Sequence, residues 1–154
     1  MSLQVGDQAP NFTCKTDGDG ELSLQSLRGK KVVLYFYPKN MTPGCTIESE
    51  AFRDLLAEFE AANTVIIGAS KDNVARHDKF KTKSQLPFTL ISDEDGVLCE
   101  VYGVWRMKKL YGKEYMGIVR STFLIDEKGF VQAVWDKVRV KGHVDVVLDA
   151  AKAS

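Results

Sequence analysis

The sequence predicts one α/β domain, residues 1–154, in which helices flank a mixed central sheet. Two apolar runs, 32–37 and 64–69, lack polar alternation, which is typical of strands buried on both faces. A stretch with helical periodicity separates them, so the connection is a crossover and the two strands should be parallel. Alternating segments near both ends of the chain predict antiparallel hairpins. The length suits a single domain, and no repeat or low-complexity tract divides it.

The first element is predicted to be a β-hairpin. Residues 12–15 and 21–24 alternate in polarity on either side of an Asp-Gly-Asp-Gly sequence at 17–20, and Asp-Gly is a strong turn signal. The strand at 32–37 is followed by a helix predicted from Pro43 onward. Its apolar residues recur at helical spacing with charged residues between them. The apolar set is Ile47, Ala51, Phe52, Leu55, Leu56 and Phe59, and the charged set is Glu48, Arg53, Asp54 and Glu58.

The second half continues the alternation of strands and helices. The predicted elements are a strand at 64–69, a polar helix at 73–83, a strand at 88–91, a helix with Val97, Leu98, Val101 and Tyr102 on one side, a hairpin of 121–125 with 131–135, and a last helix with Val144, Val147, Leu148 and Ala151. Asp93 or Asp95 should cap the helix that follows them. The basic and aromatic stretch 105–109 is expected to be a solvated loop. This order suits a thioredoxin-like fold with an N-terminal β-hairpin extension, and a fold alone gives no function.

Composition excludes several classes of partner. Twenty-one Lys and Arg balance twenty-one Asp and Glu, so no global basic charge favours nucleic acid. The longest apolar runs are strand-sized, so none can span a bilayer, and the first residues lack a signal-peptide pattern. We expect a cytoplasmic protein. His77 and His143 are far apart and no CxxC occurs, so no metal site is predicted, and no cofactor is expected.

Three cysteines, Cys14, Cys45 and Cys99, are scattered along the chain. In a reducing compartment such thiols are usually buried packing residues unless one of them is activated. Cys45 is the candidate, because it lies in the first turn of the helix that follows a central strand. Sites in open α/β sheets lie at this edge, and a helix N-terminus favours an anion such as a thiolate. From these cues alone, a reactive thiol and a buried packing cysteine remain equally open.

Neighbouring residues suit a reactive thiol. Thr42, three residues before Cys45, offers a hydroxyl that could donate to the sulfur or to an approaching oxygen. Pro38 and Pro43 stiffen the loop and cover the sulfur on one side. Arg120 immediately precedes an apolar strand, where a guanidinium is costly unless it is paired. A surface ion pair is the commoner role for such an arginine.

The chain resembles the peroxiredoxins over nearly its whole length. Pro38-x-x-x-Thr42-x-x-Cys45 matches their active-site signature, and the longer string 37–54 is similar to the bacterioferritin-comigratory or Q-type subfamily. Three further blocks match in order, at 6–12, 90–93 and 120–126. A single PxxxTxxC is only moderately specific, whereas four blocks in the right order are strong evidence.

The resemblance implies a role for each matching residue. Cys45 corresponds to the peroxidatic cysteine, whose thiolate attacks the terminal oxygen of a hydroperoxide and becomes a sulfenic acid. Thr42, Arg120 and the backbone N–H groups near Gly44 and Cys45 would hold the two oxygens, and Pro38 would shield the sulfenic acid. With Pro43 in the supporting loop, these residues form the expected site. The implied activity is reduction of hydrogen peroxide and small organic hydroperoxides to water or alcohol, as an antioxidant.

The resolving step departs from the pattern. Q-type members often carry a resolving cysteine five residues after the first, where this chain has Glu50, or on the next helix near 80–83, where it has none. Cys99 could resolve, since it lies about 130° from its helix's apolar stripe at 100° per residue and so toward solvent. We expect Cys99 to be a packing residue instead, and Cys14 to be more buried still. Two chains could also join through Cys45.

The expected cycle therefore uses one cysteine and an external thiol from thioredoxin, glutaredoxin or glutathione. A two-cysteine cycle with Cys99 is the alternative. A non-enzymatic redox sensor or interaction protein is the alternative class, and the missing CxxC disfavours a dithiol oxidoreductase. We expect a monomer, with a dimer as the other outcome.

Overall fold

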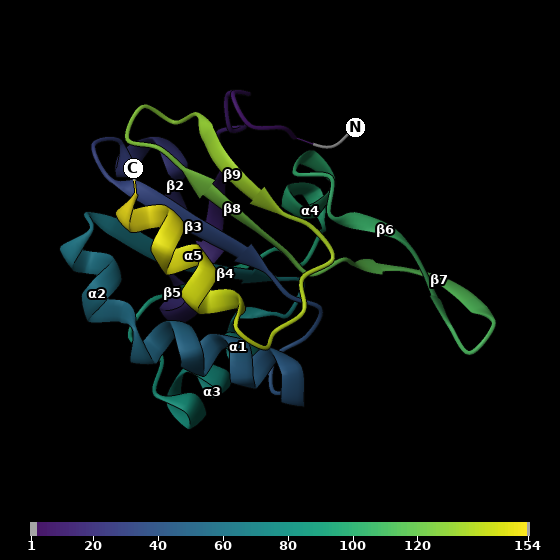
Figure 1. Ribbon diagram of the computed structural model, residues 1–154. Coiled ribbons are helices and arrows are strands. Elements are labelled where there is room, and N and C mark those ends of the chain that lie inside the picture. Colours follow the sequence, from purple (N-terminus) through teal and green to yellow (C-terminus); the bar gives the residue numbers. More distant parts are fainter. Residues whose placement is uncertain (1–2, 154) are drawn as a thin grey trace.

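The computed structural model describes residues 3–153 and contains a seven-stranded mixed sheet in the order β2-β1-β5-β4-β3-β8-β9 (Figure 1). The strands of this sheet are β1 (Thr13–Thr16), β2 (Glu21–Ser23), β3 (Lys31–Phe36), β4 (Thr64–Ser70), β5 (Thr89–Ser92), β8 (Ser121–Ile125) and β9 (Val131–Trp135). The helices are α1 (Pro43–Asp54), α2 (Leu56–Ala61), α3 (Val74–Ser84), α4 (Val97–Val101) and α5 (His143–Lys152). A separate hairpin consists of β6 (Trp105–Leu110) and β7 (Lys113–Ile118).

Strand β3 is an interior strand of the sheet. It pairs in parallel with β4 and antiparallel with β8, and all six of its residues are buried. This explains why its sequence is apolar without alternation, as the sequence predicted. The predicted N-terminal hairpin is confirmed as β1–β2, and the late hairpin as β8–β9. The mixed thioredoxin-like α/β fold is therefore confirmed.

Side chains of β3 alternate between two cores on opposite faces of the sheet. Val32, Leu34 and Phe36 contribute to one core, which the N-terminal segment and α4 cover. Val33 and Tyr35 contribute to the other, which α1, α2, α3 and α5 cover. We call these the α4 face and the α1 face. Among the described residues, no helix is long and apolar enough to cross a membrane.

The stretch 105–109 was expected to be a loop, and this expectation is wrong. It belongs to β6, which pairs with β7 through six residue pairs to form an arm that projects away from the main sheet (Figure 1). Most residues of both strands are exposed or half-exposed, so neither face of the arm shows the polar alternation that marks a strand packed on a core. The arm therefore lacks the usual sequence signal.

The predicted apolar stripe of the first helix is also partly wrong. Ile47 is 61% exposed, whereas Glu48, expected on the polar side, is fully buried. The buried residues of α1 are Cys45, Glu48, Ser49 and Phe52, spaced three and four apart along one side. The helix also breaks at Leu55, which separates α1 from α2. The side of α1 that meets the sheet thus carries polar groups, and these belong to the site.

Candidate active site

Cys45 lies where the loop after β3 enters α1. Met41 adopts a left-handed conformation (φ 63°), Thr42 is the N-cap residue in extended conformation, and Pro43 occupies the first turn. Proline is favoured there because a backbone N–H in the first turn has no acceptor within the helix, so a residue without an N–H loses no hydrogen bond. Cys45 follows two residues later and is 1% exposed. The first turn of the helix therefore holds the thiol at the carboxyl edge of the central strand, beneath the surface.

Arg120 reaches this thiol from the neighbouring strand. Because β8 runs antiparallel to β3 and pairs Ser121 with Phe36, the residue before Ser121 emerges beside the loop that follows β3. The guanidinium Nη2 of Arg120 donates to Cys45 Sγ at 3.2 Å, and its Nη1 donates to Glu48 Oε1 at 2.6 Å. Burial alone would lower the pKa of Arg120, but the charges of Glu48 and Cys45 outweigh it and raise that pKa. The guanidinium is thus a permanent cation against the sulfur.

Glu48 is the buried counter-charge of this arginine. Its ion pair with Arg120 is almost closed to solvent, and in the described part of the chain its second oxygen, Oε2, has no hydrogen-bond partner. Burial raises the pKa of Glu48 to about 7 even though Arg120 opposes the shift. The carboxyl group is therefore close to half protonated at neutral pH. Local periodicity missed Glu48, because a charged residue on an amphipathic helix is normally read as solvated.

Two further residues of the signature have distinct settings. The Thr42 hydroxyl donates to the Lys39 carbonyl at 2.9 Å. The expected donation to the sulfur or to an approaching oxygen stays a prediction. Gly44 is needed for space, because a Cβ there would lie 3.3 Å from Arg120 Nη2, tighter than ordinary contact. The glycine lets the guanidinium lie directly against the first turn of α1.

A pocket of about 470 Å³ opens beside Arg120. Its lining combines apolar and cationic side chains: Pro38, Met107, Lys108, Lys109, Val119, Arg120, Lys137 and Val138. Lys108 donates to the Ile118 carbonyl at 2.9 Å, and burial, helped by the nearby Arg120 charge, lowers its pKa. Pro38 therefore lies on the wall of a cationic pocket that Arg120 also lines.

Beneath the loop lies a closed ring of buried hydrogen bonds. The Asn40 backbone N–H donates to Asp72 Oδ2 at 2.8 Å, and the Asn40 side-chain Nδ2 lies 3.1 Å from His77 Nδ1. His77 Nε2 lies 3.5 Å from Ser70 Oγ, which donates to Asp72 Oδ2 at 2.6 Å. The Tyr37 hydroxyl donates to Asn40 Oδ1 at 2.6 Å. The ring thus starts and ends on one residue of the loop.

These bonds fix the protonation state of the ring. Because Tyr37 occupies the Asn40 oxygen, the amide nitrogen faces His77 Nδ1, which must accept and leaves the proton on Nε2. Burial lowers the pKa of His77, in agreement with a neutral imidazole. Burial alone would raise the pKa of Asp72, but the bonds from Ser70 and Asn40 outweigh it and lower that pKa. His77 was assigned to a polar helix, yet its side chain is fully buried.

The other two cysteines lie on the opposite face of the sheet. Cys14 and Cys99 pack in the α4-face core, whereas Cys45 packs in the α1-face core. Cys99 is fully buried, which confirms the expectation of a packing residue, whereas Cys14 is half-buried, so the expectation that Cys14 is the more buried of the two is wrong. Leu98 and Cys99 point inward on α4, while Val97 and Val101 are exposed. The apolar stripe of this short helix therefore runs through Cys99, which the sequence pattern had turned toward solvent.

Cys99 also has a negative neighbour. Asp93 accepts the backbone N–H groups of Leu98 (3.0 Å) and Cys99 (2.9 Å), so it caps α4 as predicted. Burial, reinforced by this carboxylate, raises the pKa of Cys99. Burial likewise raises the pKa of Cys14 to about 11. Both thiols are thus held protonated.

Comparison with known proteins assigns the class. The family model described as the AhpC/TSA family matches residues 5–134, so the chain belongs to this family. It is 55% identical over 148 residues to a Coxiella burnetii protein assigned as a peroxiredoxin Bcp (96% of this chain, 98% of that one) and 48% identical over 152 residues to peroxiredoxin Bcp of Bacillus subtilis (99% and 97%). The solved bacterioferritin comigratory protein of Xanthomonas campestris is 41% identical, with a TM-score of 0.91, and covers 97% of this chain and 98% of its own.

The chain is therefore a peroxiredoxin of the bacterioferritin-comigratory, or Q-type, group, as the sequence resemblance indicated. Such proteins are thiol peroxidases that reduce hydroperoxides.

Proposed function

We propose that Cys45 is the peroxidatic nucleophile of this thiol peroxidase. The observation that carries the proposal is the 3.2 Å contact between Arg120 Nη2 and Cys45 Sγ at the start of α1. A fixed cation and the positive end of the helix both favour the thiolate, which is the reactive form. Cys99 also lies in the first turn of a helix, but there the Asp93 carboxylate accepts its backbone N–H and, together with burial, raises the pKa of its thiol.

In the proposed reaction the Cys45 thiolate attacks the terminal oxygen of ROOH. A sulfur–oxygen bond forms as the oxygen–oxygen bond breaks, and RO⁻ leaves and takes up a proton to become water or an alcohol. Cys45 is left as a sulfenic acid, oxidised by two electrons. Arg120 is close enough to stabilise the negative charge that moves onto the leaving oxygen. Glu48 orients Arg120 through the bond to Nη1.

Thr42, Pro38 and Gly44 support this step. Rotation of the Thr42 hydroxyl away from the Lys39 carbonyl would let it donate to a peroxide oxygen. Pro38 covers one side of the pocket and limits the access of water to the sulfenic acid. Gly44 leaves room for the guanidinium, and Pro43 fixes the first turn of α1.

The proposed substrates are hydrogen peroxide and small organic hydroperoxides. The pocket beside Arg120 carries apolar groups from Pro38, Met107, Val119 and Val138, which suit a small alkyl substituent. The Xanthomonas campestris relative is described with alkyl peroxide reduction activity. No group beyond the protein's own side chains takes part in the step.

Regeneration is proposed to follow a one-cysteine cycle with an external thiol. Cys99 and Cys14 lie across the central sheet from Cys45, and a disulfide requires Cα atoms within about 7 Å. A resolving role for Cys99 would require α1 or α4 to leave its core. Thioredoxin, glutaredoxin or glutathione can supply the thiol, and the reducing cytoplasm is the compartment where they are available. We propose that the protein acts there as a monomer.

Intact mass spectrometry after one equivalent of hydrogen peroxide tests the proposal. With a sulfenic-acid trap present, we expect one adduct on Cys45. Without it, we expect no loss of two hydrogens linking Cys45 to Cys99. A Cys45–Cys99 disulfide would establish a two-cysteine cycle, and an unmodified Cys45 would overturn the peroxidatic assignment.

A further inference from the structure

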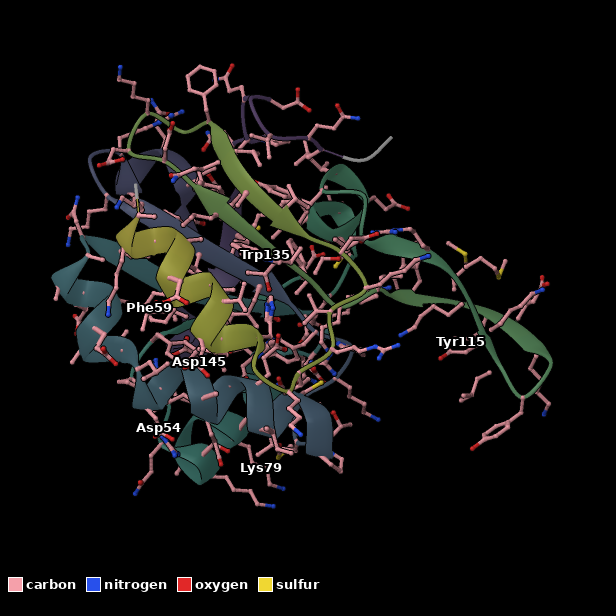
Figure 2. The ribbon with its side chains drawn as sticks, in the orientation of Figure 1. Asp54, Phe59, Lys79, Tyr115, Trp135 and Asp145 are labelled. Atoms are coloured by element: carbon pink, nitrogen blue, oxygen red, sulfur yellow. The ribbon has the colours of Figure 1, made fainter. Side chains whose placement is uncertain are left out.

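The β6–β7 arm places apolar side chains in solvent. It stands apart from the main sheet, and six residues per strand at about 3.4 Å each give it a reach of roughly 20 Å (Figure 1). Its exposed large apolar residues are Met107, Leu110, Tyr111, Tyr115 and Met116. Tyr115 lies on the arm, apart from the body of the protein (Figure 2). Gathered on one short hairpin, these residues are more than isolated exposed side chains.

Tyr111 is the residue of the arm whose side chain contributes least to the stability of the fold. It forms the two-residue turn of the arm together with Gly112, and both have positive φ angles, 51° and 77°. Such turns strongly prefer Asn, Asp or Gly, because a bulky residue with positive φ is strained. Tyr111 is also 96% exposed, so no packing within the described chain offsets that strain. An aromatic ring kept at a strained, solvated tip is the pattern expected of a binding contact.

The arm is also basic, although the chain as a whole is neutral. The arm contains Arg106, Lys108, Lys109 and Lys113 against Glu114 alone. Arg106 pairs with Asp136 outside the arm and Lys109 with Glu114, which leaves Lys108 and Lys113 as cations without an ion pair in the described part of the chain. Strand β6 borders the pocket beside Arg120, since Met107, Lys108 and Lys109 line it together with Pro38 and Arg120. A partner held on the arm would therefore face the pocket that is lined by Arg120, whose guanidinium contacts Cys45.

We propose that the β6–β7 arm, with Tyr111 as its anchor, docks the protein that delivers the reducing thiol to Cys45. Because the arm is basic and apolar, the partner is a dithiol protein whose nucleophilic cysteine lies in an acidic surface with an apolar rim. This inference rests on the proposed one-cysteine cycle, in which an outside thiol must reach Cys45.

The docked partner completes the cycle in two balanced steps. Its thiolate attacks the sulfur of the Cys45 sulfenic acid, forming a mixed disulfide and releasing hydroxide, which becomes water. Its second thiol then attacks the partner's own sulfur in that bond, so the Cys45 thiolate leaves and the partner departs as a disulfide. Two electrons pass from the partner to Cys45.

The test compares a protein reductant with a small one. Peroxide consumption is measured with an acidic bacterial thioredoxin, recycled by its NADPH-dependent reductase, and separately with dithiothreitol, which needs no docking. The first variant is Leu110→Ser/Tyr111→Asn, which removes the apolar tip while asparagine suits the turn. We expect kcat/KM for thioredoxin to fall about tenfold or more and the dithiothreitol rate to stay within about twofold.

Charge is tested by Lys113→Glu and by a matched control, Lys79→Glu, on the exposed side of α3 away from the arm (Figure 2). Lys113→Glu should lower kcat/KM for thioredoxin several-fold at low salt, and the difference should shrink at high salt because the charges are exposed. Lys79→Glu should have no effect. Circular dichroism checks that each variant is folded.

Several outcomes would overturn the inference. These are equal loss with both reductants, an unchanged thioredoxin rate in the tip variant, or wild-type protein that dithiothreitol reduces and thioredoxin does not. Two further outcomes would also overturn it if the tip variant leaves the thioredoxin kinetics unchanged. Self-association that is lost in the tip variant, measured by sedimentation, would assign the arm to a second copy of this chain. Binding to anionic vesicles that is lost in the tip variant would assign it to a membrane surface. If neither reductant supports peroxide turnover by the wild type, the proposed function fails instead.

Discussion

Cys45 and Cys99 are the same residue type in two opposite electrostatic settings. Both are buried at the start of a helix, one on each face of the central sheet. Cys45 accepts a hydrogen bond from the Arg120 guanidinium, whereas Cys99 lies against the Asp93 carboxylate. A cation favours the thiolate and a carboxylate disfavours it. Burial is common to the two, so the sign of the neighbouring charge is the difference that matters.

This comparison also separates two kinds of helix start. At α1, the side chain of the N-cap residue Thr42 makes no capping hydrogen bond, and the carboxylate of Glu48 is directed to Arg120. At α4, the free N–H groups of Leu98 and Cys99 are consumed by Asp93. A helix N-terminus favours an anion only while its donors are available. The position of a cysteine in a first turn is therefore not enough to make it reactive.

The largest expected effect is a difference in peroxidase activity among variants of the three cysteines. Cys45→Ser should abolish peroxide reduction, because serine is not a nucleophile of comparable strength at neutral pH. Cys99→Ser and Cys14→Ser should keep wild-type rates within about twofold, measured as peroxide consumption with dithiothreitol. Cys99→Ala is the matched control for stability, since serine places a hydroxyl in the core. Loss of turnover in the Cys99 variants with the fold intact would contradict the one-cysteine cycle.

The second effect concerns Arg120. Arg120→Lys should lower the second-order rate constant for Cys45 oxidation about 10²- to 10³-fold, because one ammonium group cannot bond both Glu48 and the sulfur as the planar guanidinium does. Stopped-flow fluorescence with hydrogen peroxide measures this constant.

Stability must be controlled in this experiment, because a lysine at position 120 cannot reproduce the guanidinium contact with the buried Glu48 carboxylate. The double variant Arg120→Lys/Glu48→Gln removes that charge. A rate that recovers in the double variant would make Arg120 a structural counter-ion rather than a group acting on the reacting atoms.

The fold was predictable from the sequence, and the polar part of the site was only half predictable. Strand β3 could be predicted because a strand buried on both faces requires an apolar run. The start of α1 could be predicted from Pro43. Cys45, Thr42 and Arg120 followed from the family signature. Glu48 did not follow from its helix, because the local pattern of a charged residue is the same whether its partner is water or an arginine 72 positions away.

The same reasoning explains the ring beneath the loop and the arm. His77 occupies a helix of low hydrophobicity, so only its distant partners Asn40 and Ser70 reveal that it is buried. The arm has no buried face, so the alternation that identifies a strand is absent from 105–118. Local periodicity reports burial against a core and cannot report pairing between distant polar groups.

The third effect is a pH dependence of stability. Burial raises the pKa of Glu48 to about 7, so between roughly pH 4.5 and 7 the native state binds a proton that the unfolded state has lost. Stability should therefore fall as the pH rises through this window. Glu48→Gln removes this contribution while its carbonyl still accepts from Arg120. The variant should gain up to about 3 kcal/mol relative to wild type between pH 5 and pH 8.

Urea unfolding of both proteins at the two pH values measures the difference. Glu50→Gln is the control, since this residue lies on the same helix and is partly exposed. A pH-independent difference between wild type and Glu48→Gln would mean that Glu48 is ionised throughout the range.

The smallest expected effect concerns the closed ring of hydrogen bonds beneath the Cys45 loop. His77→Leu fills a similar volume but leaves the buried Asn40 amide without an acceptor, which should cost about 1–3 kcal/mol. His77→Gln offers a carbonyl to Asn40 and an N–H to Ser70, so it should lose less than half of that.

We expect the rate constant for Cys45 oxidation to fall a few-fold in the leucine variant and to recover in the glutamine variant. Lys79→Ala, on the exposed side of α3, is the control. Equal losses in the leucine and glutamine variants would show that packing, and not the closed ring of hydrogen bonds, holds the loop against Arg120.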